Sequence, residues 1–263
     1  MLFRSIYNRY PSAGLGPHYL RNYPQFNQVI QGGNHGRSYY NSAQISIRRN
    51  MASFQIFANY TFSKSIDIGS AEGNGYAAPI DPLNMVLGRG PSDWNRPHAF
   101  NASAIYVLPI GRGKALGGDM PAWLDSAIGG WELGGLMQWQ SGSNFTISSG
   151  RVTTWGGITT WANYSGDRTI GGIQRRDGGI WFYDPGTVNN FSFPGAGELG
   201  NSGRNAFRGP RYTNIDLSIV KRFRIYEDHR ITFRAEGYNI LNHTNFGNPT
   251  VGITTPATFG RIS

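Results

Sequence analysis

Residues 53–65 of this chain read Ser53-Phe54-Gln55-Ile56-Phe57-Ala58-Asn59-Tyr60-Thr61-Phe62-Ser63-Lys64-Ser65. Every second residue from 54 to 62 is apolar, and the residues between them are polar except for Phe57. This period of two predicts a β-strand with one apolar face. Strands of soluble proteins usually end after about five or six residues, whereas a strand that crosses a bilayer needs roughly 9–11. The length of this stretch therefore favours a membrane-spanning strand.

Five other stretches show a similar alternation, although Ile105, Val107 and Leu136 interrupt the polar sides of two of them. The six predicted strands are residues 39–49, 53–65, 98–108, 129–141, 212–223 and 230–239. The connections are short at 50–52 and 224–229, of medium length at 109–128, and long at 66–97, 142–210 and from 240 onward. Outer-membrane barrels have short periplasmic turns and longer extracellular loops. The predicted fold class is all-β: a partial antiparallel transmembrane β-barrel whose six strands form a meander.

The composition excludes several classes of protein. The chain has 263 residues and no cysteine, so disulfides, thiol catalysis and cysteine-based metal sites are absent. No stretch approaches 18 consecutive apolar residues, so a transmembrane helix is not expected. The net charge of +9 is scattered, which indicates a basic surface over loops and turns. A polyanion or lipopolysaccharide partner is the sharper alternative, and nucleic acid is not expected as a partner.

The two ends of the chain and the number of strands suggest a part of a longer protein. Residues 1–7 lack the basic start and apolar core of a signal peptide, and the chain stops at Ser263 without a closing strand. Six strands are also fewer than the roughly eight of the smallest membrane barrels. We therefore expect residues 1–263 to be one partial barrel domain, either a fragment or one member of an assembly.

The polar sides of the predicted strands carry ionisable groups of both signs. A basic residue that faces lipid at the bilayer midplane costs about 2–4 kcal/mol, so these residues are predicted to face the lumen. The alternative is that they form cross-strand ion pairs that only stabilise the wall. Lys221 alternates with the apolar residues and is expected at the membrane interface. The lumen candidates are Arg48, Glu132, Asp216, Arg222, Arg234 and Glu236.

The 142–210 connection is rich in glycine, which argues against a packed layer of its own. It also carries aromatic residues that could stack on a solute outside the cell. They could equally pin the loop to itself. The candidates for contact with a ligand are Trp155, Trp161, Tyr164, Trp181 and Tyr183.

Signatures of enzymes are missing from the sequence. The five histidines have no spacing typical of a metal site, and residues 111–114 lack the spacing and the Ser/Thr of a phosphate-binding loop. Asp216 and Glu236 resemble a glycosidase pair, but they lie on predicted strands beside arginines. We therefore expect no catalytic residue, no metal and no cofactor.

Several strings at the edges of the predicted loops resemble, in this order, the C-terminal barrel of Oar-like TonB-dependent receptors. The strings are YTFSKS (60–65), GPSDWNRPH (90–98), LPIGRGK (108–114), GWEL (130–133), QSG (140–142), GNSGRN (200–205), RAEGYN (234–239) and NFGNP (245–249). The resemblance covers about residues 20–262. It implies a 22-stranded barrel filled by a plug domain, a carboxypeptidase-regulatory-like domain ahead of the plug, and uptake of large or scarce solutes with energy from TonB. This sequence shows no TonB box, no plug and no terminal strand ending in an aromatic residue.

The predicted function is therefore the barrel of a TonB-dependent receptor in the outer membrane of a Gram-negative bacterium. Its expected partners are outer-membrane lipid, a plug domain, the TonB system and an unknown solute. The alternatives are a passive porin-type channel and a secreted β-sandwich that binds carbohydrate. A sandwich would bury Ile45, Ile56, Leu217 and Phe233 beneath a second layer, whereas a barrel would expose them to lipid.

Overall fold

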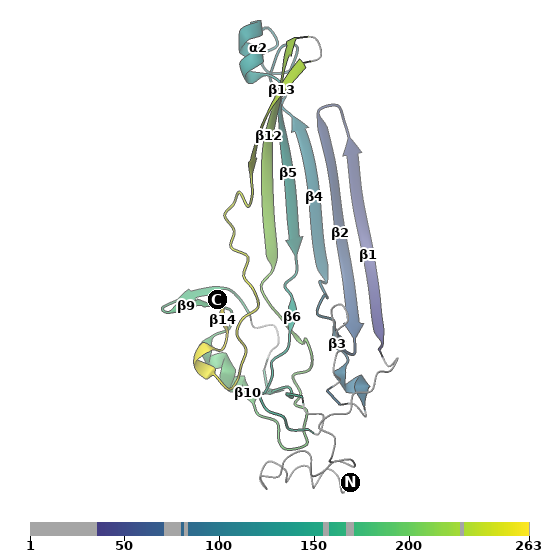
Figure 1. Cartoon of the computed structure of the whole chain (residues 1–263), viewed down its shortest axis with the longest axis vertical. Helices are drawn as coiled ribbons and strands as arrows, with labels where there is room; N and C mark the ends of the chain where they lie inside the picture. Colours follow the sequence, from purple (N-terminus) through teal and green to yellow (C-terminus); the bar gives the residue numbers. More distant parts are fainter. Residues whose placement is uncertain are drawn as a thin grey trace.

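The computed structural model describes residues 36–70, 80–81, 84–154, 158–166, 171–226 and 229–262. Most of the segment that precedes the first predicted strand lies outside them. Six long strands form one antiparallel meander, each paired with the next along the chain (Figure 1). They are β1 (Ser38–Asn50), β2 (Phe54–Asp67), β4 (His98–Val107), β5 (Trp131–Gln140), β12 (Tyr212–Tyr226) and β13 (His229–Gly237). A seventh, short strand, β3 (Gly90–Pro91), pairs with β2. All six predicted strands are confirmed.

The ends of the last hairpin differ from the prediction. Strand β12 continues to Tyr226 and β13 starts at His229, so the turn is shorter than the predicted 224–229. Strand β13 ends at Gly237 rather than at 239. The reason is local, because Asn239 adopts a positive φ of 46°, which ends the extended backbone.

The register of the sheet keeps the alternating side chains aligned from strand to strand. Ile45 pairs with Tyr60, Tyr60 pairs with Phe100, and Phe100 pairs with Trp139. Because directly paired residues point to the same side of a sheet, most of the apolar residues of the six strands gather on one face. We call this side of the sheet the apolar face and the other side the polar face.

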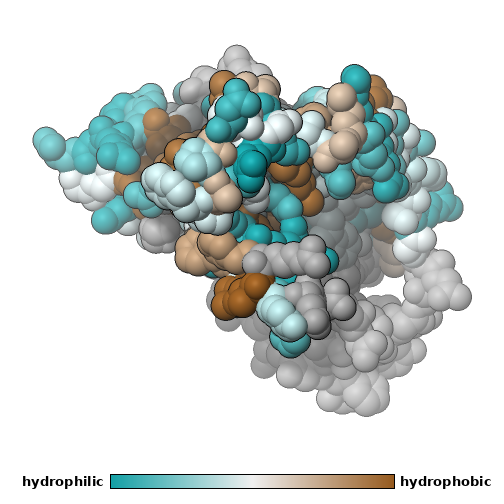
Figure 2. All heavy atoms as spheres, turned by 90° about the horizontal axis from the view of Figure 1, so that it is seen from above, coloured by the Kyte–Doolittle hydropathy of each residue, from teal (hydrophilic) through white to brown (hydrophobic). Residues whose placement is uncertain are grey.

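The apolar face has no second layer of described residues over it. Ile45 is 63% exposed, and Leu217 and Phe233 are each 48% exposed, while Ile56 is partly exposed. Figure 2 looks onto the end that carries the short turns and shows hydrophobic residues at the surface among hydrophilic ones. A sandwich buries such a face against a second sheet, so this arrangement contradicts the sandwich alternative.

The long connections fold together at one end of the sheet. We call residues 143–209 and 246–262 the cap. Its strands are short: β6 (Asn144–Phe145), β7 (Asn163–Tyr164), β8 (Gln174–Arg176), β9 (Gly179–Trp181), β10 (Phe191–Ser192), β11 (Phe207–Arg208) and β14 (Arg261–Ile262). The 3₁₀-helices η3 (Pro185–Asn190) and η4 (Pro256–Thr258) also belong to it, whereas η2 (Met85–Gly88) lies in the connection between β2 and β4.

The cap contains its own hydrophobic core, so the prediction that residues 142–210 lack a packed layer is wrong. Its buried residues are Phe145, Ile147, Ala162, Phe182, Tyr183, Phe191, Phe207, Ile253, Phe259 and Ile262. The C-terminal segment completes this core, since β14 pairs with β9. Glycines with positive φ, such as Gly200 and Gly260, allow the sharp turns that bring these scattered apolar residues together.

The connection between β4 and β5 carries the helix α2 (Ala122–Ile128), at the end of the sheet opposite the cap (Figure 1). It therefore lies at the same end as the tight turns that join β1 to β2 and β12 to β13. Across the described ranges, no α-helix has both the length and the apolar character needed to cross a membrane.

Candidate functional site

The structure brings all six predicted lumen residues to the polar face. One row across the sheet pairs Arg48 with Phe57, Phe57 with Ser103, Ser103 with Leu136, and Leu136 with Asp216. The other four candidates lie on the same face of the sheet as this row, because side chains alternate between the two faces along a strand. They are Glu132, Arg222, Arg234 and Glu236.

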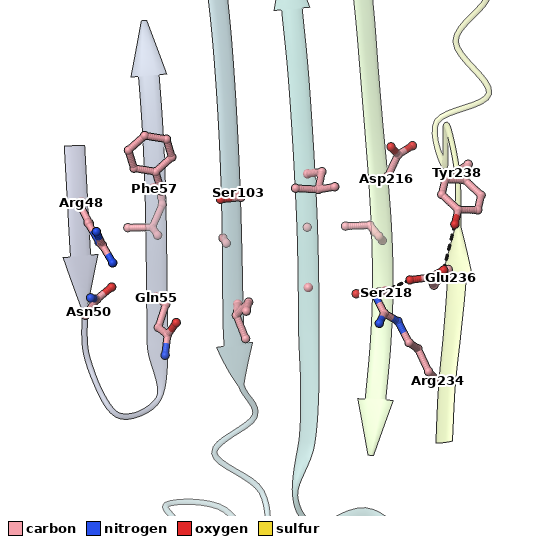
Figure 3. A pocket seen from close by; sticks show the side chains of 17 residues that line it. Arg48, Asn50, Gln55, Phe57, Ser103, Asp216, Ser218, Arg234, Glu236 and Tyr238 are labelled. Atoms are coloured by element: carbon pink, nitrogen blue, oxygen red, sulfur yellow. Dashed lines mark hydrogen bonds and ion pairs between the residues drawn. The ribbon is translucent and has the colours of Figure 1, made fainter. Parts of the chain in front are cut away.

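The polar face is hollowed between its two outer strands. The hollow has a volume of about 610 Å³ and extends from Arg48 on β1 to Glu236 on β13. Figure 3 shows Asn50 and Gln55 near one side of it and Asp216 near the other. A concave surface with charged and amide side chains suits contact with water, a solute or another protein domain.

Most of the charged groups on this face already have partners within the wall. Arg222 forms an ion pair with Glu132 on the neighbouring strand. Arg234 lies 2.6 Å from Glu236 on the same strand, and the Tyr238 hydroxyl donates to Glu236 at 2.9 Å. Of these contacts, Arg222–Glu132 is a cross-strand ion pair, and such a pair contributes about 0.2–1 kcal/mol. It fits the alternative that the charges stabilise the wall.

Asp216 holds the chain where it leaves β13. Its Oδ1 accepts hydrogen bonds from the Asn239 backbone N–H at 2.8 Å and from the Asn214 amide at 2.9 Å. Arg48, by contrast, has no ion-pair partner among the described residues. Among these six residues, Arg48 is therefore the charge that remains available to a ligand.

The apolar residues that interrupt the polar sides are also gathered by the fold. Phe57, Ile105 and Leu136 lie on the neighbouring strands β2, β4 and β5, and all three are exposed on the polar face. They form an apolar patch between Arg48 and Asp216. The polar face is therefore mixed in character.

Lys221 lies on the apolar face, as its position in the alternation predicts, but it is only 3% exposed. Its Nζ donates to the Gly129 carbonyl at 2.6 Å. The same atom lies 5.3 Å from the Trp131 ring centre and 5.0 Å from that of Phe223. The charge is thus covered by aromatic rings and by the connection that carries α2.

Two of the five candidate loop aromatics are buried. Tyr183 belongs to the cap core, and Trp181 lies on β9 between β8 and β14. Tyr164 is partly buried and stacks on Phe191 with ring centres 4.4 Å apart. Burial, with a smaller contribution from Tyr164, raises the pKa of the Tyr183 hydroxyl well above its usual range. These three residues pin the cap to itself, as the alternative interpretation has it. Trp161 is partly exposed.

Trp155, the fifth candidate, lies outside the described residues. No surface cluster of loop aromatics is therefore assembled from Trp161, Tyr164, Trp181 and Tyr183.

Sequence reasoning did not identify the joint between the cap and the sheet. Arg204 forms an ion pair with Asp67, the last residue of β2, and lies 3.6 Å from Asp93. Its guanidinium also donates to the Gly88 carbonyl at 2.9 Å. Burial lowers the pKa of Arg204 from its ordinary value. A guanidinium remains charged at neutral pH even so, and its fork geometry suits several acceptors at once.

Asn205 continues this joint. It adopts a positive φ of 52° and donates to the Pro91 carbonyl at 2.9 Å and to the Asp93 carboxylate. Two of the strings noted in the sequence, GPSDWNRPH and GNSGRN, therefore contact each other although more than 100 residues separate them. This contact gives those strings a structural explanation.

Among the described residues, no three His, Asp or Glu side chains lie together so that they could hold a metal ion. A family model described as "Outer membrane beta barrel domain" matches residues 4–263 of the chain. No curated protein matches it, and neither does any solved structure.

Proposed function

Because this chain belongs to the outer membrane beta barrel domain family, we propose that it forms part of the wall of a TonB-dependent receptor. Its place is the outer membrane of a Gram-negative bacterium. The family membership accounts for the all-β fold and the long antiparallel strands. The uptake of a solute with energy from TonB is the proposal, and the loop-edge strings that resemble Oar-like receptors support it.

In this proposal the apolar face contacts lipid and the polar face looks into the bore. Ile45, Leu217 and Phe233 are exposed on a face without a second layer of described residues. Arg48 and Asp216 share the opposite face with the other four charged candidates. Because ionised groups are costly in hydrocarbon and apolar groups are not, this division fits only one orientation in a bilayer.

One observation favours a plugged receptor over an open channel: the hollow is lined by both charged and apolar side chains. Phe57, Ile105 and Leu136 are exposed between charged residues. An apolar patch rimmed by polar residues is typical of a surface that contacts another protein. A water-filled pore of the porin type offers nothing to cover such a patch, whereas a plug domain does.

The further partners follow from the same arrangement. The cap, which lies at the end of the long loops, is the part that meets a solute outside the cell. No covalent chemistry is proposed, since Asp216 and Glu236 both hold hydrogen bonds within the wall. Nucleic acid is not proposed as a partner.

Ionic conductance distinguishes the two membrane functions. The protein is purified as the bacterium produces it and inserted into planar bilayers, with a general porin measured in parallel as the open control. A plugged receptor is expected to give no steady conductance. A conductance that rises in proportion to the number of inserted molecules would favour the passive channel.

A second measurement tests the source of energy. The periplasmic domain of TonB from the same bacterium is titrated against the purified protein. Saturable binding is expected of a TonB-dependent receptor. If no binding is detected, the barrel family remains and the TonB-dependent function is lost.

A further inference from the structure

The connection 109–128 is longer than the other two turns at its end of the sheet, and the transport function does not explain its length. It is a compact unit. The Asp125 carboxylate accepts the Arg112 backbone N–H at 2.7 Å, and the Leu116 backbone N–H donates to the Pro109 carbonyl at 2.9 Å. The connection therefore has a defined shape, and its exposed side chains have defined positions.

This connection is attached to the apolar face. The Trp131 indole donates to the Ala127 carbonyl at 3.3 Å, and Lys221 donates to the Gly129 carbonyl. Trp131 of β5 and Lys221 of β12 lie directly opposite each other on neighbouring strands, on the apolar face. The Trp131 ring also packs edge-on against Phe233, with ring centres 5.9 Å apart. The connection thus continues the surface that faces lipid.

Three large apolar side chains of the connection have no covering layer of described residues. Trp123 is 71% exposed, and Leu116 and Ile128 are also exposed. The cations Arg112 and Lys114 lie exposed in the same connection. Tryptophan is enriched at the level of the lipid headgroups, and long basic side chains reach from apolar surfaces to the phosphates.

We propose that residues 109–128 form an interfacial anchor. In it, Leu116, Trp123 and Ile128 insert among the phospholipids of the periplasmic leaflet, and Arg112 and Lys114 contact the lipid phosphates. The periplasmic leaflet follows from the short turns at this end, which face the periplasm in outer-membrane barrels. Continuity with the apolar face identifies lipid as the occupant. The anchor also covers Lys221, so that a cation on the apolar face avoids hydrocarbon.

A single-site label tests this proposal, and the absence of cysteine from the chain makes it straightforward. The full chain carrying Trp123→Cys is labelled with an environment-sensitive fluorophore and folded into phosphatidylethanolamine–phosphatidylglycerol vesicles. The expected result is a blue-shifted emission. The fluorescence is expected to be quenched when the vesicles contain lipid brominated near the headgroup. Iodide in the water is expected to leave the fluorescence intensity unchanged. Ile128→Cys provides a second position if the first variant folds poorly.

Val152→Cys is the matched control, since Val152 is exposed in the cap at the other end of the molecule. Its label is expected to respond to iodide and not to brominated lipid. The proposal is overturned if the labels at 123 and 128 behave like the label at 152. It is also overturned if they become shielded only after periplasmic protein is added, because the surface would then bind protein. These outcomes are independent of whether TonB drives uptake.

Discussion

The guanidinium of Arg204 in the cap forms an ion pair with the carboxylate of Asp67, the last residue of β2, 137 positions earlier in the chain. The two side chains are only 15% and 9% exposed. The pair therefore joins the cap to the sheet in a place that is largely shielded from water.

Arg204→Ala is expected to destabilise this joint strongly. Removal of one partner of a buried ion pair leaves an unpaired charge and costs about 3–5 kcal/mol. Arg176→Ala is the matched control, because the Arg176–Asp184 pair is roughly half exposed and such pairs contribute about 0–1 kcal/mol. Denaturant unfolding of both variants measures the difference. An equal loss of unfolding free energy in the two variants would show that the buried ion pair contributes no more than the exposed one.

Phe259→Ala is expected to loosen the cap and leave the sheet intact. Phe259 is fully buried and packs against Tyr183 and Phe191, with ring centres 6.0 and 5.3 Å away. Truncation of a buried phenylalanine typically costs about 3–5 kcal/mol. Hydrogen exchange should accelerate in residues 144–208 and 250–262 while β2 and β4 stay protected. Equal loss of protection in the long strands would mean that cap and sheet unfold as one unit.

Alkaline pH is expected to destabilise the cap through Tyr183. Burial raises the pKa of this hydroxyl above its ordinary value of 10.0, so the folded state keeps the proton after the unfolded state has released it. The stabilisation is therefore complete below pH 10 and is lost as the pH rises further. Tyr183→Phe should unfold at a higher pH than the unsubstituted chain, as followed by circular dichroism. An unchanged alkaline midpoint would contradict the assignment to Tyr183.

Gly142→Ala is expected to disturb the start of the cap. A Cβ at position 142 would overlap the backbone carbonyl oxygens of Gly209 and Pro210, where two segments cross closely. Forced repacking of this kind costs about 1–3 kcal/mol. At Gly172 a Cβ would meet no atom within 4 Å, so Gly172→Ala should change the unfolding free energy by less than about 0.5 kcal/mol. Similar stabilities of the two variants would argue against a close crossing at 142.

The strands could be predicted from the sequence because each one alternates over its whole length. The period of two in residues 53–65 is a local signal. The register of the hairpin is not, because a turn at 50–52 would pair Ile45 with Phe57, whereas Asn50 pairs with Gln55 and Ile45 with Tyr60. The same alternation predicts that Arg48 and Asp216 lie on the polar face, and the pairing of the strands agrees. Local periodicity thus accounts for the sheet and for the polar face.

The cap could not be predicted because its signal is not local. Phe145, Phe207 and Phe259 belong to one core although more than 50 residues separate each from the next in the sequence. Many glycines suggested the absence of packing, whereas they provide the turns that make the packing possible. The partner of Arg204 was equally hidden, since nothing near position 204 points to Asp67.

In the proposed arrangement the polar face looks into a bore and the apolar face touches lipid. Ser103 and Ala102 are adjacent on β4 and point to opposite faces, so Ser103→Cys and Ala102→Cys each receive a nitroxide spin label in the full chain folded into vesicles. A water-soluble nickel chelate is expected to relax the label at 103, and oxygen, which concentrates in lipid, is expected to relax the label at 102. The reverse pattern, or equal access of the nickel chelate to both labels, would contradict this arrangement.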